Sequence, residues 1–103
     1  MQDRYDEVFQ FIRSVPSGKV VTYGQVAECI ESGGVTARMV GAFLRSSPEN
    51  VPWHRVVGAG GKYSVGKIDP ALAVLQKTRL SEEGVSFKRN GDVDMVVSQY
   101  EAP

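Results

Sequence analysis

The sequence predicts a small, mainly α-helical domain with a small β element, built around a helix-turn-helix. Three observations lead to this prediction. Apolar residues recur at the spacing of an amphipathic helix, glycines and prolines separate these segments, and only short β-prone runs lie between them. A chain of 103 residues can form one modest hydrophobic core, so residues 1–103 are expected to be a single domain.

The first helix is expected over residues 3–14. Its apolar side chains fall at positions i, i+3, i+4 and i+7, and they are Tyr5, Val8, Phe9 and Ile12. Pro16 and Gly18 end this helix, because proline lacks a backbone N–H and glycine favours other conformations. We expect four aromatic side chains to lie in the core: Tyr5, Phe9, Phe43 and Phe87.

The helix-turn-helix follows a β-prone run over residues 19–22. Thr22 is suited to cap the first of its two helices. In that helix, apolar residues fall at positions i, i+3, i+4 and i+7, and they are Tyr23, Val26, Ala27 and Ile30. Gly33 and Gly34 then predict a tight turn, after which the second helix begins at Thr36 and stops before Pro48. Its inner face is expected to hold Val40, Phe43 and Leu44.

The remaining part of the chain shows weaker patterns. A pair of valines, Val56 and Val57, precedes a glycine-rich turn over residues 58–61 and a loop that reaches Gly66. Asp69 and Pro70 are typical of an N-cap followed by the first helical residue, and the helix that they begin is expected to run to about Glu83. Residues 85–87 and 95–97 are β-prone and are expected to form short extended pieces.

Composition and charge limit the classes of function. No apolar run approaches the roughly 20 residues of a membrane span, so we expect a cytoplasmic protein without a membrane partner. A single Cys29 and a single His54 favour neither an internal disulfide nor a metal site, and no cofactor is expected. The net charge is zero, yet residues 36–67 carry five basic side chains against Glu49 alone. This basic central segment suits either a solvated surface or contacts with phosphates.

The outer face of the second helix combines two arginines with two small residues. Arg38, Gly41, Ala42 and Arg45 also lie at i, i+3, i+4 and i+7, on the side away from the inner face. Small residues allow a helix to approach another surface closely, and guanidinium groups beside them suit phosphates or a displaced base. From these residues alone, simple packing of the small residues under a neighbouring element is the favoured interpretation, and contact with DNA is the alternative.

The segment from Pro52 to Val56, with the sequence Pro-Trp-His-Arg-Val, carries the most information about function. It resembles the active-site signature of O6-alkylguanine-DNA alkyltransferases, with Trp53 at the position of the nucleophilic cysteine. Transfer of an alkyl group needs a thiolate, and the indole of Trp53 has no lone pair available for attack. Three further blocks, residues 22–27, 37–42 and 83–85, resemble the same family in the same order. With tryptophan at this position, the chain is identified as a member of the alkyltransferase-like proteins.

The resemblance implies a winged-helix-like fold, similar to the C-terminal domain of the alkyltransferases, and an unusual use of the helix-turn-helix. Its second helix is expected to enter the minor groove of duplex DNA, and a damaged nucleotide is rotated out of the stack. Arg38 corresponds to the finger that fills the gap left by the flipped base, and Tyr23 to the residue that crowds the phosphate. Arg45 is also expected to contact DNA. The small or polar residues that contact the groove are expected to be Thr36, Ala37, Gly41 and Ala42.

The resemblance also implies a lesion pocket around Trp53, whose aromatic face contacts the flipped base. His54 and Glu83 correspond to the hydrogen-bonded pair that activates the cysteine of true transferases, and here we expect them to be structural. Arg55 is expected to brace the pocket through buried hydrogen bonds. In the poorly matching loop from residue 58 to 70, Lys67, or alternatively Lys62, is a candidate cation beside the lesion.

The expected function is therefore that of a monomeric sensor which binds O6-alkylguanine in double-stranded DNA, does not repair it, and directs it to nucleotide excision repair. Two alternatives belong to other classes. One is an enzyme, either a transferase that uses Cys29 or a hydrolase that uses His54 and Glu83, although a lone cysteine in a helix is more often a small packing residue. The other is a helix-turn-helix regulator that recognises an undamaged sequence through the major groove.

Overall fold

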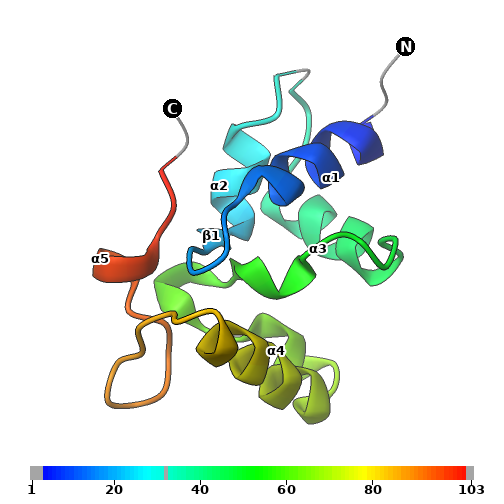
Figure 1. Cartoon of the computed structure of the whole chain (residues 1–103). Coiled ribbons are helices and arrows are strands. Elements are labelled where there is room, and N and C mark those ends of the chain that lie inside the picture. The colour runs from blue at the N-terminus through cyan, green and yellow to red at the C-terminus, as the bar shows by residue number, and fades with distance from the viewer. Residues whose placement is uncertain (1–3, 32, 102–103) are drawn as a thin grey trace.

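The computed structural model describes residues 4–31 and 33–101, and the chain is mainly helical, as predicted (Figure 1). The α-helices are α1 (Arg4–Ser14), α2 (Tyr23–Glu28), α3 (Ala37–Arg45), α4 (Pro70–Glu82) and α5 (Met95–Ser98). Three 3-10 helices lie between α3 and α4, namely η1 (Trp53–Arg55), η2 (Ala59–Gly61) and η3 (Ser64–Lys67). The strands are β1 (Val21–Thr22) and β2 (Val56–Val57). Asp3, where the first helix was expected to begin, lies outside the described residues.

The two short strands pair in parallel and join distant parts of the chain. Val21 lies opposite Val56, and Thr22 lies opposite Val57. All four residues except Thr22 are fully buried, which is typical of parallel strands covered on both faces. Because β1 leads directly into α2 and η1 leads directly into β2, this pairing fixes the helix-turn-helix relative to the segment that contains Trp53.

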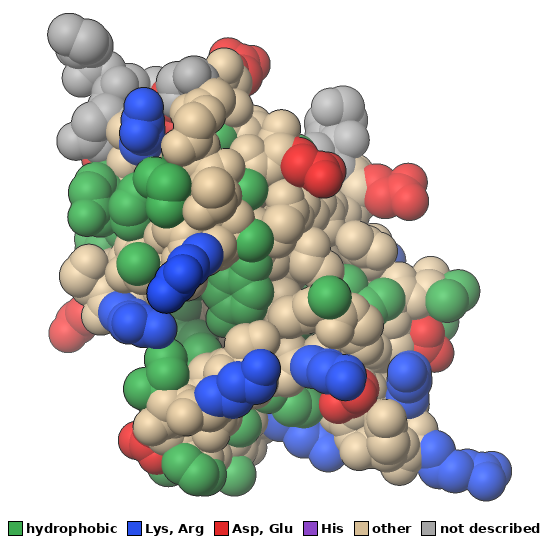
Figure 2. All heavy atoms as spheres, turned by 180° about the vertical axis from the view of Figure 1, so that it is seen from behind, with side chains coloured by type: hydrophobic (Ala, Val, Ile, Leu, Met, Phe, Trp, Pro, Cys, Tyr) green, Lys and Arg blue, Asp and Glu red, His purple; other side chains and the backbone are tan. Residues whose placement is uncertain are grey.

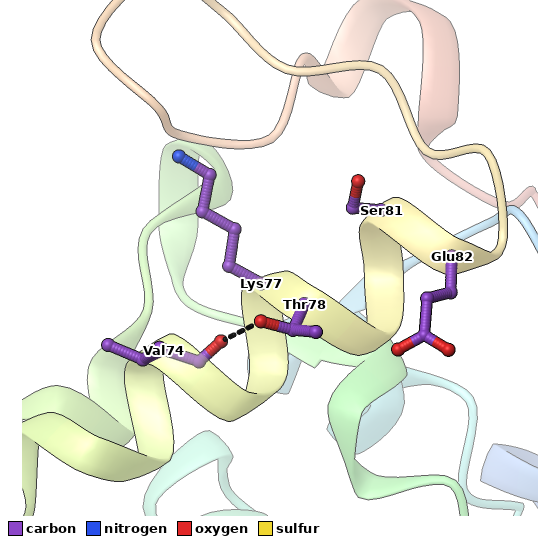
Figure 3. Close-up of a pocket in the computed structure, with 5 residues that line it drawn as sticks. All are labelled: Val74, Lys77, Thr78, Ser81 and Glu82. Carbon is purple, nitrogen blue, oxygen red and sulfur yellow. Dashed lines mark hydrogen bonds between the residues drawn. The ribbon is translucent and has the colours of Figure 1, made fainter.

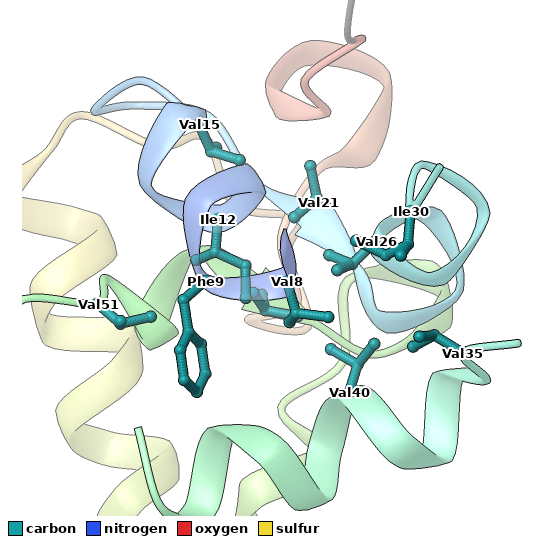
Figure 4. Close-up of a cluster of buried hydrophobic side chains, with 11 residues drawn as sticks. Val8, Phe9, Ile12, Val15, Val21, Val26, Ile30, Val35, Val40 and Val51 are labelled. Carbon is teal, nitrogen blue, oxygen red and sulfur yellow. The ribbon is translucent and has the colours of Figure 1, made fainter. Parts of the chain in front are cut away.

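The larger of two hydrophobic clusters holds α1, α2 and α3 together. Figure 4 shows side chains from the three helices directed toward one another, among them Val8 and Ile12 of α1, Val26 of α2 and Val40 of α3. These four side chains have no exposed surface, and full burial of each stabilises the fold by roughly 1.5–3 kcal/mol. A second cluster lies between the sheet, α4 and the C-terminal segment, and contains Val20, Val57, Leu80, Val85 and Val93.

The N-caps predicted at Thr22 and Asp69 are confirmed, and the structure adds a third at Thr36. Thr22 and Gln25 form a capping box at α2, in which the Thr22 hydroxyl accepts a bond of 3.0 Å from the Gln25 N–H. Thr36 caps α3, since its Oγ1 accepts a bond of 3.2 Å from the N–H of Met39. Asp69 caps α4 in the same way through the N–H of Ala71, at 3.0 Å. The helix α4 ends at Glu82, one residue earlier than predicted.

Several sequence predictions are wrong in detail. The chain between α2 and α3 spans residues 29–36, so it is longer than a tight turn, although Gly33 and Gly34 both take positive φ angles, of 71° and 72°. The helix α2 ends at Glu28, which leaves Cys29 at the C-cap and exposed instead of packed. Tyr5 is 45% exposed and stacks on Phe43 from outside the core, with 4.2 Å between ring centroids.

The C-terminal β-prone pieces are also corrected by the structure. Residues 95–97 are helical, because the Asp94 side chain accepts a hydrogen bond of 3.1 Å from the Val96 N–H and caps the short helix α5. Val96 is 97% exposed, so its branched side chain packs on no sheet. Of residues 85–87, only Phe87 makes a β-bridge, with Val93.

Candidate nucleic-acid interface

The outer face of α3 is exposed except at Gly41, which is partly buried. Val40 anchors the inner face in the core, while Arg38, Ala42 and Arg45 are exposed on the other side. Thr36 and Ala37, at the start of the helix, are exposed as well. Because Ala42 lies in solvent, the alternative in which the small residues pack beneath a neighbouring element does not hold for this side chain.

Tyr23, the first residue of α2, lies beside the middle and end of this face. A Cβ atom added at Gly41 would lie 3.9 Å from Cε1 of Tyr23, which is an ordinary contact distance. Burial raises the pKa of the Tyr23 hydroxyl, and the positive charge of Arg45 lowers it in part. In the structure, Tyr23 of α2 therefore lies close to Gly41 and Arg45 of α3.

Trp53 begins η1 and is half-buried between two side chains from different parts of the chain. Its ring meets the ring of His54 edge to face, with 6.4 Å between centroids. The guanidinium carbon of Arg79, in α4, lies 5.6 Å from the centroid of the Trp53 ring. Arg79 was not predicted as a site residue, although it precedes Glu83 by four positions and four positions along a helix place two side chains on one face.

A polar cluster joins His54 and Arg55 of η1 to Glu83, the C-cap of α4. The Glu83 carboxylate lies 2.8 Å from Nε2 of His54, and it accepts bonds of 3.0 and 2.8 Å from Nε and Nη2 of Arg55. It also accepts a bond of 3.2 Å from the Gly18 N–H, and Arg55 donates its Nη1 to the Val15 carbonyl at 2.9 Å. The predicted hydrogen bond between His54 and Glu83 is present, and Arg55 makes hydrogen bonds in a partly buried site, as predicted.

The cluster keeps the Glu83 carboxyl ionised. Burial raises the pKa of the Glu83 carboxyl, but hydrogen bonds from Arg55, His54 and Gly18 outweigh it and bring the pKa down to about 2. An ionised carboxylate only accepts hydrogen bonds, so the proton of a neutral His54 lies on Nε2. The Nδ1 atom of His54 is buried and has no hydrogen-bond partner among the described residues. Trp53, the neighbour of His54, offers no thiol proton for a base to remove.

The depressed pKa of Glu83 predicts that acid destabilises the fold. The folded-state pKa of about 2 lies below the value of 4.5 for a free glutamate, so the stabilisation is present above pH 4.5 and is lost as the pH falls toward 2. For this side chain, which is 15% exposed, the loss amounts to at most about 3 kcal/mol. Denaturant unfolding at a series of pH values measures it. In the Glu83→Gln variant the same acid titration should cause a smaller loss, and an unchanged loss contradicts the assignment.

Gln76 is a second residue that the sequence did not point to. It is 1% exposed, and its amide donates to the carbonyls of His54 and Val56 at 3.1 and 2.8 Å. These two bonds attach α4 to the middle of η1 and the start of β2. Gln76 precedes Glu83 by seven positions, so both lie on the face of α4 that meets η1.

Within the described part of the chain, the two candidate lysines make no contact with this arrangement. Lys67 ends η3 and Lys62 follows η2, and both side chains are exposed. Among the described residues, no hydrogen bond, ion pair or ring contact joins either lysine to Trp53. Arg79 is thus the cation that the structure places against the Trp53 ring.

The surface around these elements is basic, with a hydrophobic hollow. Figure 2, which shows the molecule from behind, has Lys and Arg side chains on the side of α3 and along the lower edge near α4. Between them lies a hollow with hydrophobic side chains. A second hollow of about 380 Å³ lies on the outer side of α4, as Figure 3 shows, and is lined by Val74, Lys77, Thr78, Ser81 and Glu82. None of the predicted site residues lines this second hollow.

The residues that the structure describes contain no group of three or more side chains suited to hold a metal ion. No helix within residues 4–31 and 33–101 is long and apolar enough to cross a membrane.

Comparisons with known proteins agree on one family. Residues 3–85 match the model of the 6-O-methylguanine DNA methyltransferase DNA-binding domain. The chain is 37% identical to Alkyltransferase-like protein 1 of Schizosaccharomyces pombe, over 97% of this chain and 94% of that protein. It is 39% identical to the DNA base-flipping protein of Escherichia coli, over 85% of this chain and 67% of that protein. The crystal structure of S. pombe Atl1 in complex with damaged DNA containing O6-carboxymethylguanine superposes with a TM-score of 0.81 at 33% identity, covering 99% of this chain and all of the other.

Proposed function

Since this chain belongs to the family of the 6-O-methylguanine DNA methyltransferase DNA-binding domain, and within it to the alkyltransferase-like proteins, we propose that it senses O6-alkylguanine in duplex DNA without repairing it. Its relatives include proteins named for base flipping and a structure bound to damaged DNA. The proposal is that this chain binds the minor groove through α3, rotates the damaged nucleotide out of the duplex and holds it beside Trp53.

The observation that carries the proposal is the exposed outer face of α3, and Gly41 in particular. Glycine inside a helix costs about 1 kcal/mol relative to alanine. A methyl group at Gly41 would meet only Tyr23, at 3.9 Å, so packing within the fold does not require glycine here. A flat strip formed by Gly41 and the exposed Ala42, with an arginine at either end, suits close approach to the floor of a groove between two phosphate chains.

The residues around this strip supply the remaining steps. Arg38 stands exposed in the first turn of α3, where its planar guanidinium can fill the gap left by a rotated base. Arg45 and Tyr23 lie at the other end of the strip, where they are placed to contact a phosphate. Thr36 and Ala37 contact the groove beside Arg38, and Trp53 provides an aromatic face for the displaced base.

The proposal excludes chemistry on the alkyl group, because the site lacks a nucleophile. Trp53 has no thiol, and its indole has no lone pair available for attack. Cys29 lies at the C-cap of α2, where no activating contact accompanies it among the described residues. The bound complex then acts as a signal, and we propose that nucleotide excision repair proteins recognise it. A monomer in the cytoplasm is the form proposed to search the DNA.

A fluorescence titration tests lesion binding directly, because Trp53 is the single tryptophan of the chain. We expect a duplex with one central O6-methylguanine to quench Trp53 emission at a lower concentration than the same duplex with guanine. The difference is expected to be at least about tenfold in Kd at a fixed salt concentration, which corresponds to about 1.4 kcal/mol. Mass spectrometry of protein and DNA after the titration completes the experiment.

Each outcome separates the proposal from its alternatives. Preferential binding with unchanged masses supports a sensor. Equal binding of the two duplexes contradicts lesion recognition and leaves a general or sequence-specific DNA-binding domain. Loss of the methyl group from the DNA means that the protein is an enzyme, and a gain of the same mass on the protein identifies a transferase that uses Cys29.

A further inference from the structure

Arg79 lies over the Trp53 ring with its charge uncompensated. The guanidinium carbon is 5.6 Å from the ring centroid, and the side chain is exposed. Within the described residues it makes no hydrogen bond or ion pair. Stacking on an indole uses the flat face of a guanidinium and leaves its N–H groups directed outward, in the plane where oxygen acceptors bind.

The nearby carboxylates do not neutralise Arg79. Glu83, the C-cap of α4 four positions after Arg79, already forms hydrogen bonds with His54, Arg55 and the Gly18 N–H. Glu82 lines the hollow on the outer side of α4, together with Lys77. An anion that reaches the Trp53 ring can therefore accept hydrogen bonds from the N–H groups of Arg79.

We propose that Arg79 is an anion-binding residue of the lesion pocket, and that it makes this site favour O6 substituents that carry a carboxylate. The inference rests on the proposed function, in which Trp53 contacts the flipped base. A carboxylate is planar and accepts two parallel hydrogen bonds from an arginine, so a carboxymethyl group is the smallest substituent that gains from Arg79. A methyl group gains only contact with the ring.

A DNA phosphate also offers oxygen atoms that accept hydrogen bonds from Arg79. The experiment distinguishes a phosphate from the carboxylate of a lesion. Three duplexes are compared, with guanine, O6-methylguanine or O6-carboxymethylguanine at one position. They are titrated with the parent protein and with Arg79→Gln, Arg79→Lys and Lys77→Gln, at two salt concentrations. Lys77→Gln is the matched control, because Lys77 is also exposed on α4 (Figure 3). It also lies over an aromatic ring, with its Nζ 5.5 Å from the centroid of Phe87.

The parent is expected to bind the carboxymethyl duplex more tightly than the methyl duplex. Arg79→Gln should weaken binding of the carboxymethyl duplex by roughly five- to tenfold, as for a partly exposed charge-assisted hydrogen bond, and that of the methyl duplex by less than about twofold. Arg79→Lys should restore part of the difference, because it keeps the charge but not the planar fork. Lys77→Gln should leave the ratio between the two lesions unchanged.

Two results overturn the inference while the proposed function stands. If Arg79→Gln weakens all three duplexes equally and lowers the salt dependence of each, Arg79 contacts a phosphate. If the ratio between the two lesions does not change in Arg79→Gln, Arg79 only positions the Trp53 ring. A parent protein that binds guanine as tightly as both lesions overturns the proposed function and the inference together.

Discussion

Replacing Glu83 by alanine is expected to lower the free energy of unfolding by roughly 2–4 kcal/mol, the largest loss of stability among the substitutions considered for this protein. One carboxylate satisfies His54, Arg55 and the Gly18 N–H at the same time, and its side chain is only 15% exposed. Removing it leaves the Arg55 guanidinium without its charged partner in a site that water reaches poorly. For a domain of this size, the expected fall in Tm is about 10 °C or more.

Glu82→Ala is the control, because it removes the same charge from the neighbouring position. Glu82 is exposed, and a negative charge at the C-terminal end of α4 interacts unfavourably with the helix dipole. Its removal is therefore expected to change stability by no more than about 0.5 kcal/mol. Thermal and urea unfolding of the parent and both variants measure the difference. Equal losses for the two variants refute a special role of the Glu83 cluster.

Replacing Arg38 by alanine is expected to weaken binding of an O6-methylguanine duplex by roughly ten- to a hundredfold, the effect of losing one important arginine at a DNA interface. Arg38 is exposed and makes no hydrogen bond or ion pair within the described part of the chain, so the fold should keep its stability. Arg38→Lys keeps the charge but cannot stack as a plane, and it should recover only a small part of the affinity.

Arg89→Ala is the matched control for DNA binding. Arg89 is also an exposed arginine, and it lies in the turn between α4 and α5, away from α3 (Figure 1). Both variants lower the net charge by one, so a general loss of attraction to DNA affects them equally. Fluorescence titrations at two salt concentrations compare them. If Arg38→Ala and Arg89→Ala lose the same affinity, Arg38 contributes charge only and is not a finger.

Local sequence patterns predicted the elements that depend on neighbouring residues. Thr22 and Asp69 cap helices as predicted, because a cap needs only a side-chain oxygen within a few residues of an unpaired N–H. The same locality explains the correct division of α3 into an inner face with Val40 and an outer face with Arg38 and Ala42. The fold class and the family followed from such patterns and from four short blocks in order.

Contacts between distant segments could not be predicted in this way. The failure at residues 95–97 shows the reason, since β-branched residues there indicated a strand, and a helix formed where Asp94 supplied a cap and no strand edge was available. Gln76 and Arg79 were not predicted, because a glutamine or an arginine on a helix is usually an ordinary surface residue. Their contacts with η1 exist only because the fold brings α4 against it.

The sequence by itself determined the helical segments, their caps, the exposed face of α3 and the presence of Trp53, because each depends on residue type and spacing within one segment. The tertiary structure alone decided that Glu83 holds both His54 and Arg55, that Tyr23 borders Gly41, and that Arg79 covers the Trp53 ring. The contacts of Glu83 and Arg79 arise where the C-terminal part of α4 meets η1, and the contact between Tyr23 and Gly41 arises where α2 packs on α3. Each contact joins residues from two different elements of the chain, where neither propensity nor periodicity carries information.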